Sequence, residues 1–246
     1  MEDSANIIAP SLRPWCSTSP PRPMTPNPDL LRSLARLVRG LSVLFWGLPL
    51  ALIVCVQTTR VDLFQAFRGF APAVASGWLL FGLWELGCFQ KQERIWRVAL
   101  DRARLLAVVN LGLSPFLYWW SQAPHEPFFG KMVLLLLLTA VLFLGELNVV
   151  LRRLAAMLPD ETLRLETREF TTLNRGLLVG TLVLAAIYLG LGRLPAPPNW
   201  LVFALGLLER HALWLLIFLV LLPLAMTMAL LWKIKAVLLD SVFGRK

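Results

Sequence analysis

The chain has 246 residues, of which 57% are hydrophobic and 16% charged, with a mean hydropathy of +0.67 and a net charge of +9. A soluble domain usually has about 45–50% apolar and about 25% charged residues, and a single core of this size could not bury the excess apolar surface. The composition therefore excludes an ordinary soluble protein and predicts an all-α integral membrane protein.

The first 29 residues are predicted to be a disordered, proline-rich segment. They contain seven of the 17 prolines, and proline interrupts helices while this segment offers little apolar surface to bury. Met24 provides an alternative start, in which residues 1–23 would not be translated. The rest of the chain, residues 30–246, is expected to form one domain.

Six stretches of the domain are apolar and close to the length of about 20 residues that a helix needs to cross a bilayer. They are residues 41–57, 72–90, 105–121, 132–151, 177–193 and 212–232. The first stretch ends without a cleavage site, so we expect a retained anchor rather than a removed signal peptide. The shorter stretches 61–70 and 199–208 are predicted to be interfacial or re-entrant helices, the second set off by charged residues at 209–211. The predicted fold is a six-helix transmembrane bundle.

Lysine and arginine are distributed unevenly over the segments between these stretches. Of the 24 basic residues, 19 fall in the alternate segments 1–40, 91–104, 152–175 and 233–246, and five fall in the others. Cytoplasmic loops of membrane proteins are enriched in Lys and Arg. The sequence therefore predicts that both termini are cytoplasmic, and the compact loops favour the bacterial inner membrane.

The basic segment 152–175 is the longest of these connections. Acidic residues follow Pro159, which is typical of a helix start. Leu163, Phe170 and Leu173 are spaced to form one apolar stripe on that helix. One interpretation is a helix that rests on the inner leaflet or on its own bundle, and the other is a docking helix for a membrane or cytoplasmic protein partner.

Glycines and prolines occur at particular places in the spans. Gly176 and Gly180 form a small-xxx-small pair, which predicts close packing against another helix of the same chain rather than dimerisation. Pro49, Pro115 and Pro223 are interpreted as ordinary kinks of membrane helices. The alternative is that they break helices that line a transport site.

Polar side chains in the predicted spans lie in one layer, in the half of the bilayer nearer the cytoplasm. The most unusual are Glu85 in GLWELG and Glu146 in FLGELN. An ionised carboxylate in the hydrocarbon layer costs roughly 2.5–3.5 kcal/mol on insertion scales, so we expect both glutamates to face the bundle interior. The other candidate residues at comparable depth are Asn110, Asn148, Thr181 and Thr227.

Three interpretations of this layer remain open. It is a structural set of interhelical hydrogen bonds, worth about 0.6 kcal/mol each, or a proton or cation site with Glu85 and Glu146 as the titrating pair. Alternatively, both glutamates extend toward nearby arginines such as Arg94 or Arg152.

Motifs of known enzyme and metal sites are absent from the sequence. HExxH, G-x-S-x-G, P-loop and GxGxxG patterns do not occur, and Cys16, Cys55 and Cys88 show no metal-ligand spacing. No catalytic residue, metal site, cofactor or nucleic-acid partner is therefore predicted.

We expect a non-enzymatic scaffold or accessory subunit of a membrane complex, embedded in the lipid bilayer. The alternative is a small proton- or cation-coupled transporter or channel-like protein that uses Glu85 and Glu146. A lipid-active enzyme, with polar residues around 193–211, comes third.

Overall fold

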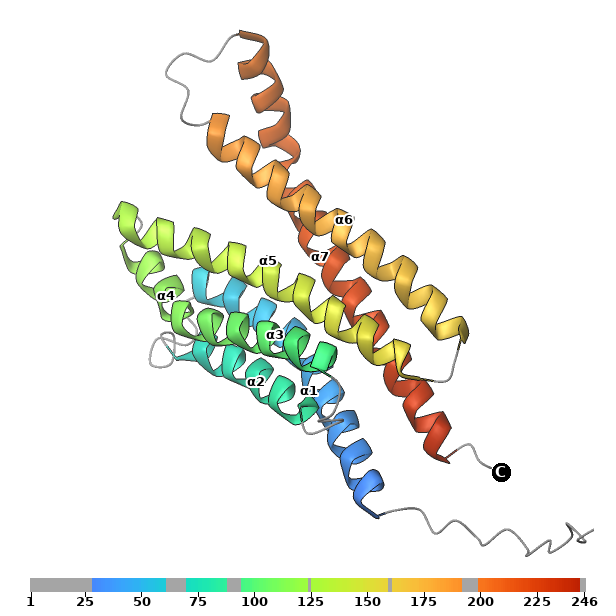
Figure 1. Ribbon diagram of the computed structural model, residues 1–246. Coiled ribbons are helices and arrows are strands. Elements are labelled where there is room, and N and C mark those ends of the chain that lie inside the picture. The colour runs from blue at the N-terminus through green and yellow to red at the C-terminus, as the bar shows by residue number, and fades with distance from the viewer. Residues whose placement is uncertain are drawn as a thin grey trace, which may run out of the picture.

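The computed structural model describes residues 28–60, 70–87, 94–123, 125–158, 161–191 and 199–243, and every regular element in these ranges is a helix. The helices are α1 (Pro28–Arg60), α2 (Ala71–Leu86), α3 (Arg94–Leu113), α4 (Pro115–Gln122), α5 (Pro127–Ala156), α6 (Glu161–Leu191) and α7 (Asn199–Phe243), as Figure 1 shows. The all-α prediction is confirmed for this part of the chain. Residues 1–27 of the predicted disordered segment 1–29, and residues 61–69 of the predicted interfacial segment 61–70, lie outside the described residues, whereas residues 28 and 29 already belong to α1.

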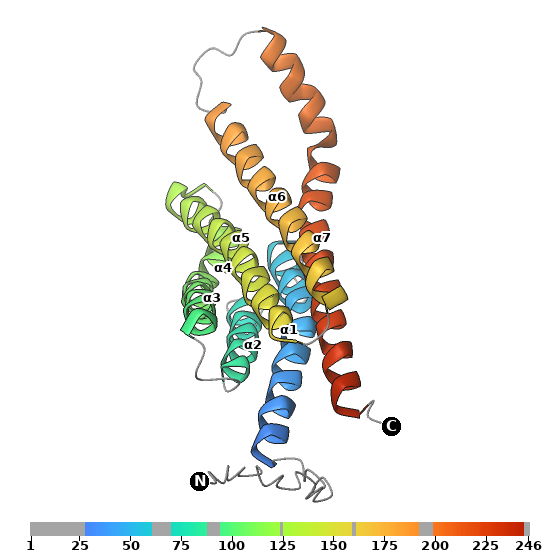
Figure 2. The ribbon, with the colours of Figure 1, turned by 45° about the vertical axis from the view of Figure 1, so that its right-hand side comes forward.

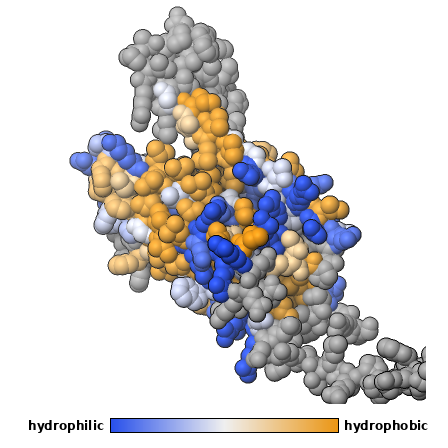
Figure 3. Space-filling view, in the orientation of Figure 1, coloured by the Kyte–Doolittle hydropathy of each residue, from blue (hydrophilic) through white to orange (hydrophobic). Residues whose placement is uncertain are grey.

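Within the described ranges, four helices contain a segment that is long and apolar enough to cross a membrane. The qualifying segments are Arg32–Thr58, Pro127–Ala156, Arg164–Ile187 and Phe218–Asp240. The most apolar window of α6 is only 17% buried, against 28–33% in the other three. Figure 3 shows hydrophobic surface over the middle of the molecule, and an apolar exterior of this kind is expected where lipid is the solvent.

The helices form one group with a projecting hairpin. α1 packs mainly on α2, and α3 packs on both α2 and α5. α6 contacts α5 and α7, while α7 also contacts α1 and α5. Figures 1 and 2 show that the connected ends of α6 and α7 extend well beyond the other helices. The α6–α7 hairpin is thus held to the rest of the bundle over only part of its length.

The third predicted span, 105–121, is not one helix. α3 ends at Leu113, Ser114 forms a turn, and α4 begins at Pro115. Proline has no N–H group and clashes with the preceding turn, but it suits the first position of a helix. Pro49 and Pro223 lie inside α1 and α7, which continue through them.

The predicted boundary between a short helix at 199–208 and a last span at 212–232 is wrong. α7 runs without interruption from Asn199 to Phe243 and includes residues 209–211. Glu, Arg and His are compatible with a helix, and none of them removes a backbone hydrogen bond as proline would. Charge alone therefore did not end the helix. The second predicted span also ends early, because α2 stops at Leu86 rather than at residue 90.

The expected packing of Gly176 and Gly180 within the chain is also wrong. Both glycines are exposed on α6, and a Cβ at either position would meet nothing within 4 Å. The opposite face of α6, which contains Asn174 and Leu178, is the one that is buried against α5 and α7. The packing of that polar face turned the two glycines outward.

Basic side chains gather at one end of the bundle. They belong to the start of α1, α3 and α6 and to the end of α5 and α7, which the ribbon brings to the same end. Hydrophilic surface is concentrated over that end in Figure 3. An ion pair between Lys233 and Glu166 joins the end of α7 to the start of α6 there. The start of α1 and the end of α7 also lie at this basic end.

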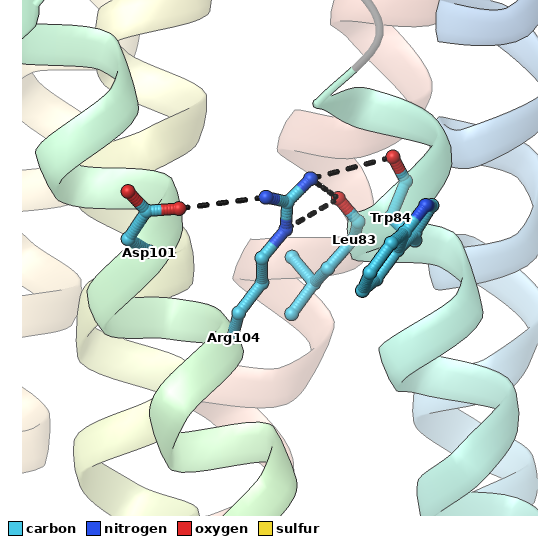
Figure 4. A network of polar contacts seen from close by, with 4 residues as sticks. All are labelled: Leu83, Trp84, Asp101 and Arg104. Atoms are coloured by element: carbon cyan, nitrogen blue, oxygen red, sulfur yellow. Dashed lines mark hydrogen bonds and ion pairs between the residues drawn. The ribbon is translucent and has the colours of Figure 1, made fainter.

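Arg104 joins α3 to the C-terminal end of α2 (Figure 4). Its guanidinium donates to the carbonyl oxygens of Leu83 at 3.2 Å and Trp84 at 3.4 Å, and lies 5.4 Å from the centre of the Trp84 ring. Asp101 forms an ion pair with it at 3.4 Å. The last carbonyls of a helix lack hydrogen-bond partners and carry partial negative charge. Arg104 supplies hydrogen-bond donors to two of them and a positive charge beside them. A Cβ at Gly87 would overlap the guanidinium, so a larger residue there would require Arg104 to move away from the α2 carbonyls.

The axes of α1 and α2 approach closely at two glycines. A Cβ at Gly40 would lie 2.7 Å from Cδ1 of Leu86 and 3.0 Å from the carbonyl oxygen of Gly82. A Cβ at Gly82 would lie 3.0 Å from Cγ of Leu44. Small residues allow helix backbones to approach in this way, and the buried leucines of α1 pack around the contact.

We predict that Gly40→Ala lowers the free energy of unfolding by about 1–3 kcal/mol, because the added methyl group must displace Leu86 and the α2 backbone. Gly77→Ala is the matched control, since a Cβ there meets nothing within 4 Å; it should be neutral or stabilising by up to about 1 kcal/mol. Denaturant titration of both proteins in detergent measures the difference. Equal stabilities would contradict the close approach of α1 and α2.

Candidate functional site

Thr227 of α7 forms hydrogen bonds with two other helices. Its hydroxyl accepts from Nδ2 of Asn148 on α5 at 3.1 Å and from Nδ2 of Asn174 on α6 at 3.0 Å. The same hydroxyl donates to the carbonyl oxygen of Pro223 at 2.8 Å. A hydroxyl has one proton and two acceptor positions, so this arrangement uses all of them.

The cluster is built around the proline of α7. Pro223 lacks an N–H group and so weakens the local backbone ladder. Nδ2 of Asn174 also donates to the Pro223 carbonyl at 3.2 Å, and Nδ2 of Asn148 donates to the Leu144 carbonyl at 2.7 Å. Asn148, Asn174 and Thr227 are all buried. The cluster, hereafter the Thr227 cluster, therefore binds α5, α6 and α7 together within one turn of Pro223.

A second polar pair joins α3 to α5. The hydroxyl of Thr139 lies 2.6 Å from Oδ1 of Asn110, and both side chains are buried. Thr139 also lies 3.0 Å from the carbonyl oxygens of Leu135 and Leu136 in its own helix. The sequence analysis identified Asn110 but not Thr139, although Thr139 is the one polar residue in the run LLLLLTAVLF.

The predicted layer is thus partly assembled. The structure brings together Asn148 and Thr227, and adds Asn174, which lies in the connection 152–175 between two predicted spans. Thr181 joins neither group, because its hydroxyl donates to the carbonyl of Leu177 in its own helix at 2.8 Å. One feature of the sequence could have indicated that Asn174 faces the bundle: it lies about one helical turn before the fifth predicted span.

Glu85 and Glu146 lie on helices that do not contact each other. α2 and α5 both contact α3, but within the described ranges no Cα of α2 lies within 8 Å of a Cα of α5. Glu85 is in the last turn of α2, and its Oε2 is buried without a hydrogen-bond partner. Glu146 is half-buried. It lies in the part of α5 that is predicted to be nearer the cytoplasm. The functional pairing of the two glutamates stays a prediction.

The buried face of α6 is polar over its first half. The buried side chains there include Thr167, Thr171 and Asn174, while the exposed face carries charged side chains together with Leu165 and Leu173, which are 65% and 62% exposed. Buried hydroxyls and amides in place of apolar side chains are the reverse of a helix on a soluble protein. Packing between membrane helices accounts for this pattern, because the bundle interior supplies hydrogen-bond partners and lipid accepts the exposed leucines.

A cavity of about 300 Å³ lies beside the Asn110–Thr139 pair. All seven helices contribute to its wall, which consists mostly of leucine, valine and alanine side chains. Asn110, Ser114 and Thr181 are among its few polar residues. The cavity is therefore suited to an apolar molecule with few polar groups.

The chemistry that these groups can perform is limited to hydrogen bonding. The Thr227 cluster and the Asn110–Thr139 pair contain amides and hydroxyls, none of which titrates near neutral pH. Within the described ranges, no three His, Cys, Asp or Glu residues are grouped so that they could hold a metal ion. No protein-family model, curated protein or solved structure matches this chain.

We predict that Thr227→Val destabilises the folded chain by about 1–3 kcal/mol, since each of two buried amides loses one of its hydrogen-bond acceptors. Thr181→Val is the matched control, because Thr181 bonds only within its own helix; its effect should stay within about 0.5 kcal/mol. Thermal unfolding of both variants in detergent provides the comparison. A Thr227→Val protein as stable as the control would show that the Thr227 cluster does not hold the hairpin.

Proposed function

We propose that this chain is a non-enzymatic membrane protein, a scaffold or accessory subunit that binds another transmembrane helix through the outer face of α6. The observation that carries the proposal is an exposed stripe on that face. It consists of Leu173, Gly176, Gly180, Val183 and Ile187, which follow one another at intervals of three and four residues. This spacing places them on one side of a helix.

The two glycines favour a helix as the partner rather than lipid alone. Each glycine in a helix interior costs about 1 kcal/mol relative to alanine, and neither Gly176 nor Gly180 is used for packing within the described chain. Between membrane helices, small residues allow close backbone contact, which is a main source of association energy. A partner helix seated on the glycines would offset their cost, and Val183 and Ile187 would flank the contact.

The same face continues toward the basic end of the bundle. Leu165 lies two turns before Leu173 on the same side of α6 and is 65% exposed. This part of α6 belongs to the segment 152–175, for which a partner was one of the two interpretations. We propose that the partner helix runs along α6 as far as Leu165, with the arginines at 164 and 168 beside it.

We propose six spans with both termini cytoplasmic, in a bacterial inner membrane. α2 has 16 residues, which is about 24 Å of helix and slightly short of a bilayer core of about 30 Å. α2 and the α3–α4 pair would complete the six. The support is the gathering of basic residues at the end of the bundle where α1 begins and α7 ends, together with the preference of Lys and Arg for the cytoplasmic side.

Reporter fusions test this orientation. Alkaline phosphatase is active only outside the cytoplasm, so a fusion after Lys246 should be inactive, whereas green fluorescent protein there should fluoresce. Alkaline phosphatase fused after Glu126, in the connection before α5, should be active. The opposite pattern at Lys246 would show that the C-terminus is not cytoplasmic.

The α6 stripe is tested by replacing both glycines. In native membranes the wild-type chain should migrate on blue native gels as a complex larger than itself. Gly176→Leu with Gly180→Leu should release the chain from that complex by filling the contact. Gly112→Leu is the matched control, since Gly112 of α3 is equally open; it should leave the complex intact.

Either of two results would contradict this proposal: a wild-type chain that migrates at its own size, or a complex unaffected by the double replacement. Self-crosslinking of the purified chain in nanodiscs would identify the partner as a second copy.

A transporter that uses Glu85 and Glu146 is the second candidate. It is favoured by one observation, the buried Oε2 of Glu85 that has no hydrogen-bond partner. Proteoliposomes with an internal pH dye measure proton flux for the wild type, Glu85→Gln and Glu146→Gln, with exposed Glu126→Gln as the control. As a scaffold, the chain should show no flux above empty liposomes. A flux that falls at least tenfold in both glutamine variants, but not in the control, would establish the transporter instead.

A further inference from the structure

The wall of the 300 Å³ cavity contains a hydrogen-bond donor that the protein leaves unused. Asn110 is 9% exposed and lines the cavity. Its Oδ1 receives the Thr139 hydroxyl at 2.6 Å, whereas its Nδ2 donates to no group in the described ranges. Buried polar groups are nearly always hydrogen-bonded. An amide that is nine-tenths buried and directed into an apolar cavity therefore points to a ligand with an acceptor oxygen.

Two other polar side chains of the wall, Ser114 and Thr181, already donate to backbone carbonyls. Ser114 donates to the carbonyl of Leu111 at 2.8 Å, and Thr181 donates to that of Leu177 at 2.8 Å. The remaining wall is chiefly aliphatic, with Phe143 as its aromatic side chain. Aliphatic walls match an alkyl chain better than a flat ring system, which aromatic side chains usually hold. The volume lies at the lower end of the range of small-molecule pockets.

The depth of the Asn110–Thr139 pair restricts the ligand further. Thr139 lies between two and three residues from the middle of α5, which is about 4 Å along the helix axis. The ester groups of a phospholipid stay near the edge of the hydrocarbon layer, about 15 Å from its centre. Moving a charged headgroup to the depth of Asn110 costs too much free energy. The ligand must be uncharged and able to enter the middle of the bilayer.

We propose that this cavity binds an uncharged long-chain carbonyl compound, whose alkyl chain fills the aliphatic space and whose carbonyl oxygen accepts a hydrogen bond from Nδ2 of Asn110. In the hydrocarbon layer of the bilayer, the ligand's carbonyl oxygen has no hydrogen-bond donor. The Asn110 amide therefore supplies a hydrogen bond that the lipid cannot. The alkyl chain gains little over lipid, and the carbonyl therefore decides which molecule is retained. This binding is independent of the proposed partner helix, because the cavity lies on the inner side of α6 and the partner helix would lie on its outer side.

Two matched probes test the proposal, 2-dodecanone and dodecane, which share the chain and differ in the carbonyl. The full-length protein is placed in nanodiscs of diether phospholipid, so that the lipid itself carries no ester carbonyl. Affinities come from the rise of the melting temperature with probe content. The ketone-to-alkane affinity ratio should be about fivefold higher in the wild type than in Asn110→Leu, as one hydrogen bond would give. Ala140→Phe, which fills the cavity, should weaken both probes.

A second measurement does not depend on any variant. The infrared carbonyl band of 2-dodecanone bound to wild-type protein should show a hydrogen-bonded component that is absent from the same nanodiscs without protein. Absence of that component, or an unchanged affinity ratio in a folded Asn110→Leu protein, would overturn the proposal. Loss of ketone binding when ester phospholipid replaces diether phospholipid would also overturn it, because the cavity would then hold a phospholipid chain.

Discussion

The hydrogen bonds of Thr227 with Asn148 and Asn174 are the interaction on which the arrangement of the C-terminal half depends. α6 contacts only α5 and α7 among the described helices, and its buried face is largely threonine and asparagine. In a bilayer, helices gain little from burying apolar side chains, because lipid is equally apolar. The bonds at Thr227 and the ion pair between Lys233 and Glu166 therefore determine how the α6–α7 hairpin is held.

The N-terminal half is held by a different means. α1 and α2 are in close contact at Gly40 and Gly82, with buried leucines around them, and Arg104 connects α3 to the end of α2. Between α1 and α2, dispersion between closely packed backbones is the main attraction. The two halves meet along α5, and the cavity beside Asn110 lies where these two kinds of packing adjoin. The proposed ligand would thus fill the space that remains between the two halves of the bundle.

Particular residues show how much could be predicted from sequence. The helical class and the candidate polar residues followed from hydropathy and from depth along each span, and Asn148 and Thr227 do meet. Asn174 was missed because its partners lie 49 and 53 positions away in sequence, so no local pattern marked it as buried. The glycines of α6 were assigned to internal packing, because sequence spacing reveals a shared face but not the direction in which that face points.

The sequence by itself determined the helices, their apolar character and the segregation of basic residues, because these depend on local propensity and on the composition of each segment. Proline alone did not decide where a helix ends, because the chain breaks at Pro115 but α1 and α7 continue through Pro49 and Pro223. Only the tertiary structure decided which face of each helix is buried, that Asn110 lies on a cavity, and that Glu85 and Glu146 sit on helices without mutual contact. Those features depend on the rotation of each helix about its axis, which is set by the packing of all its neighbours together.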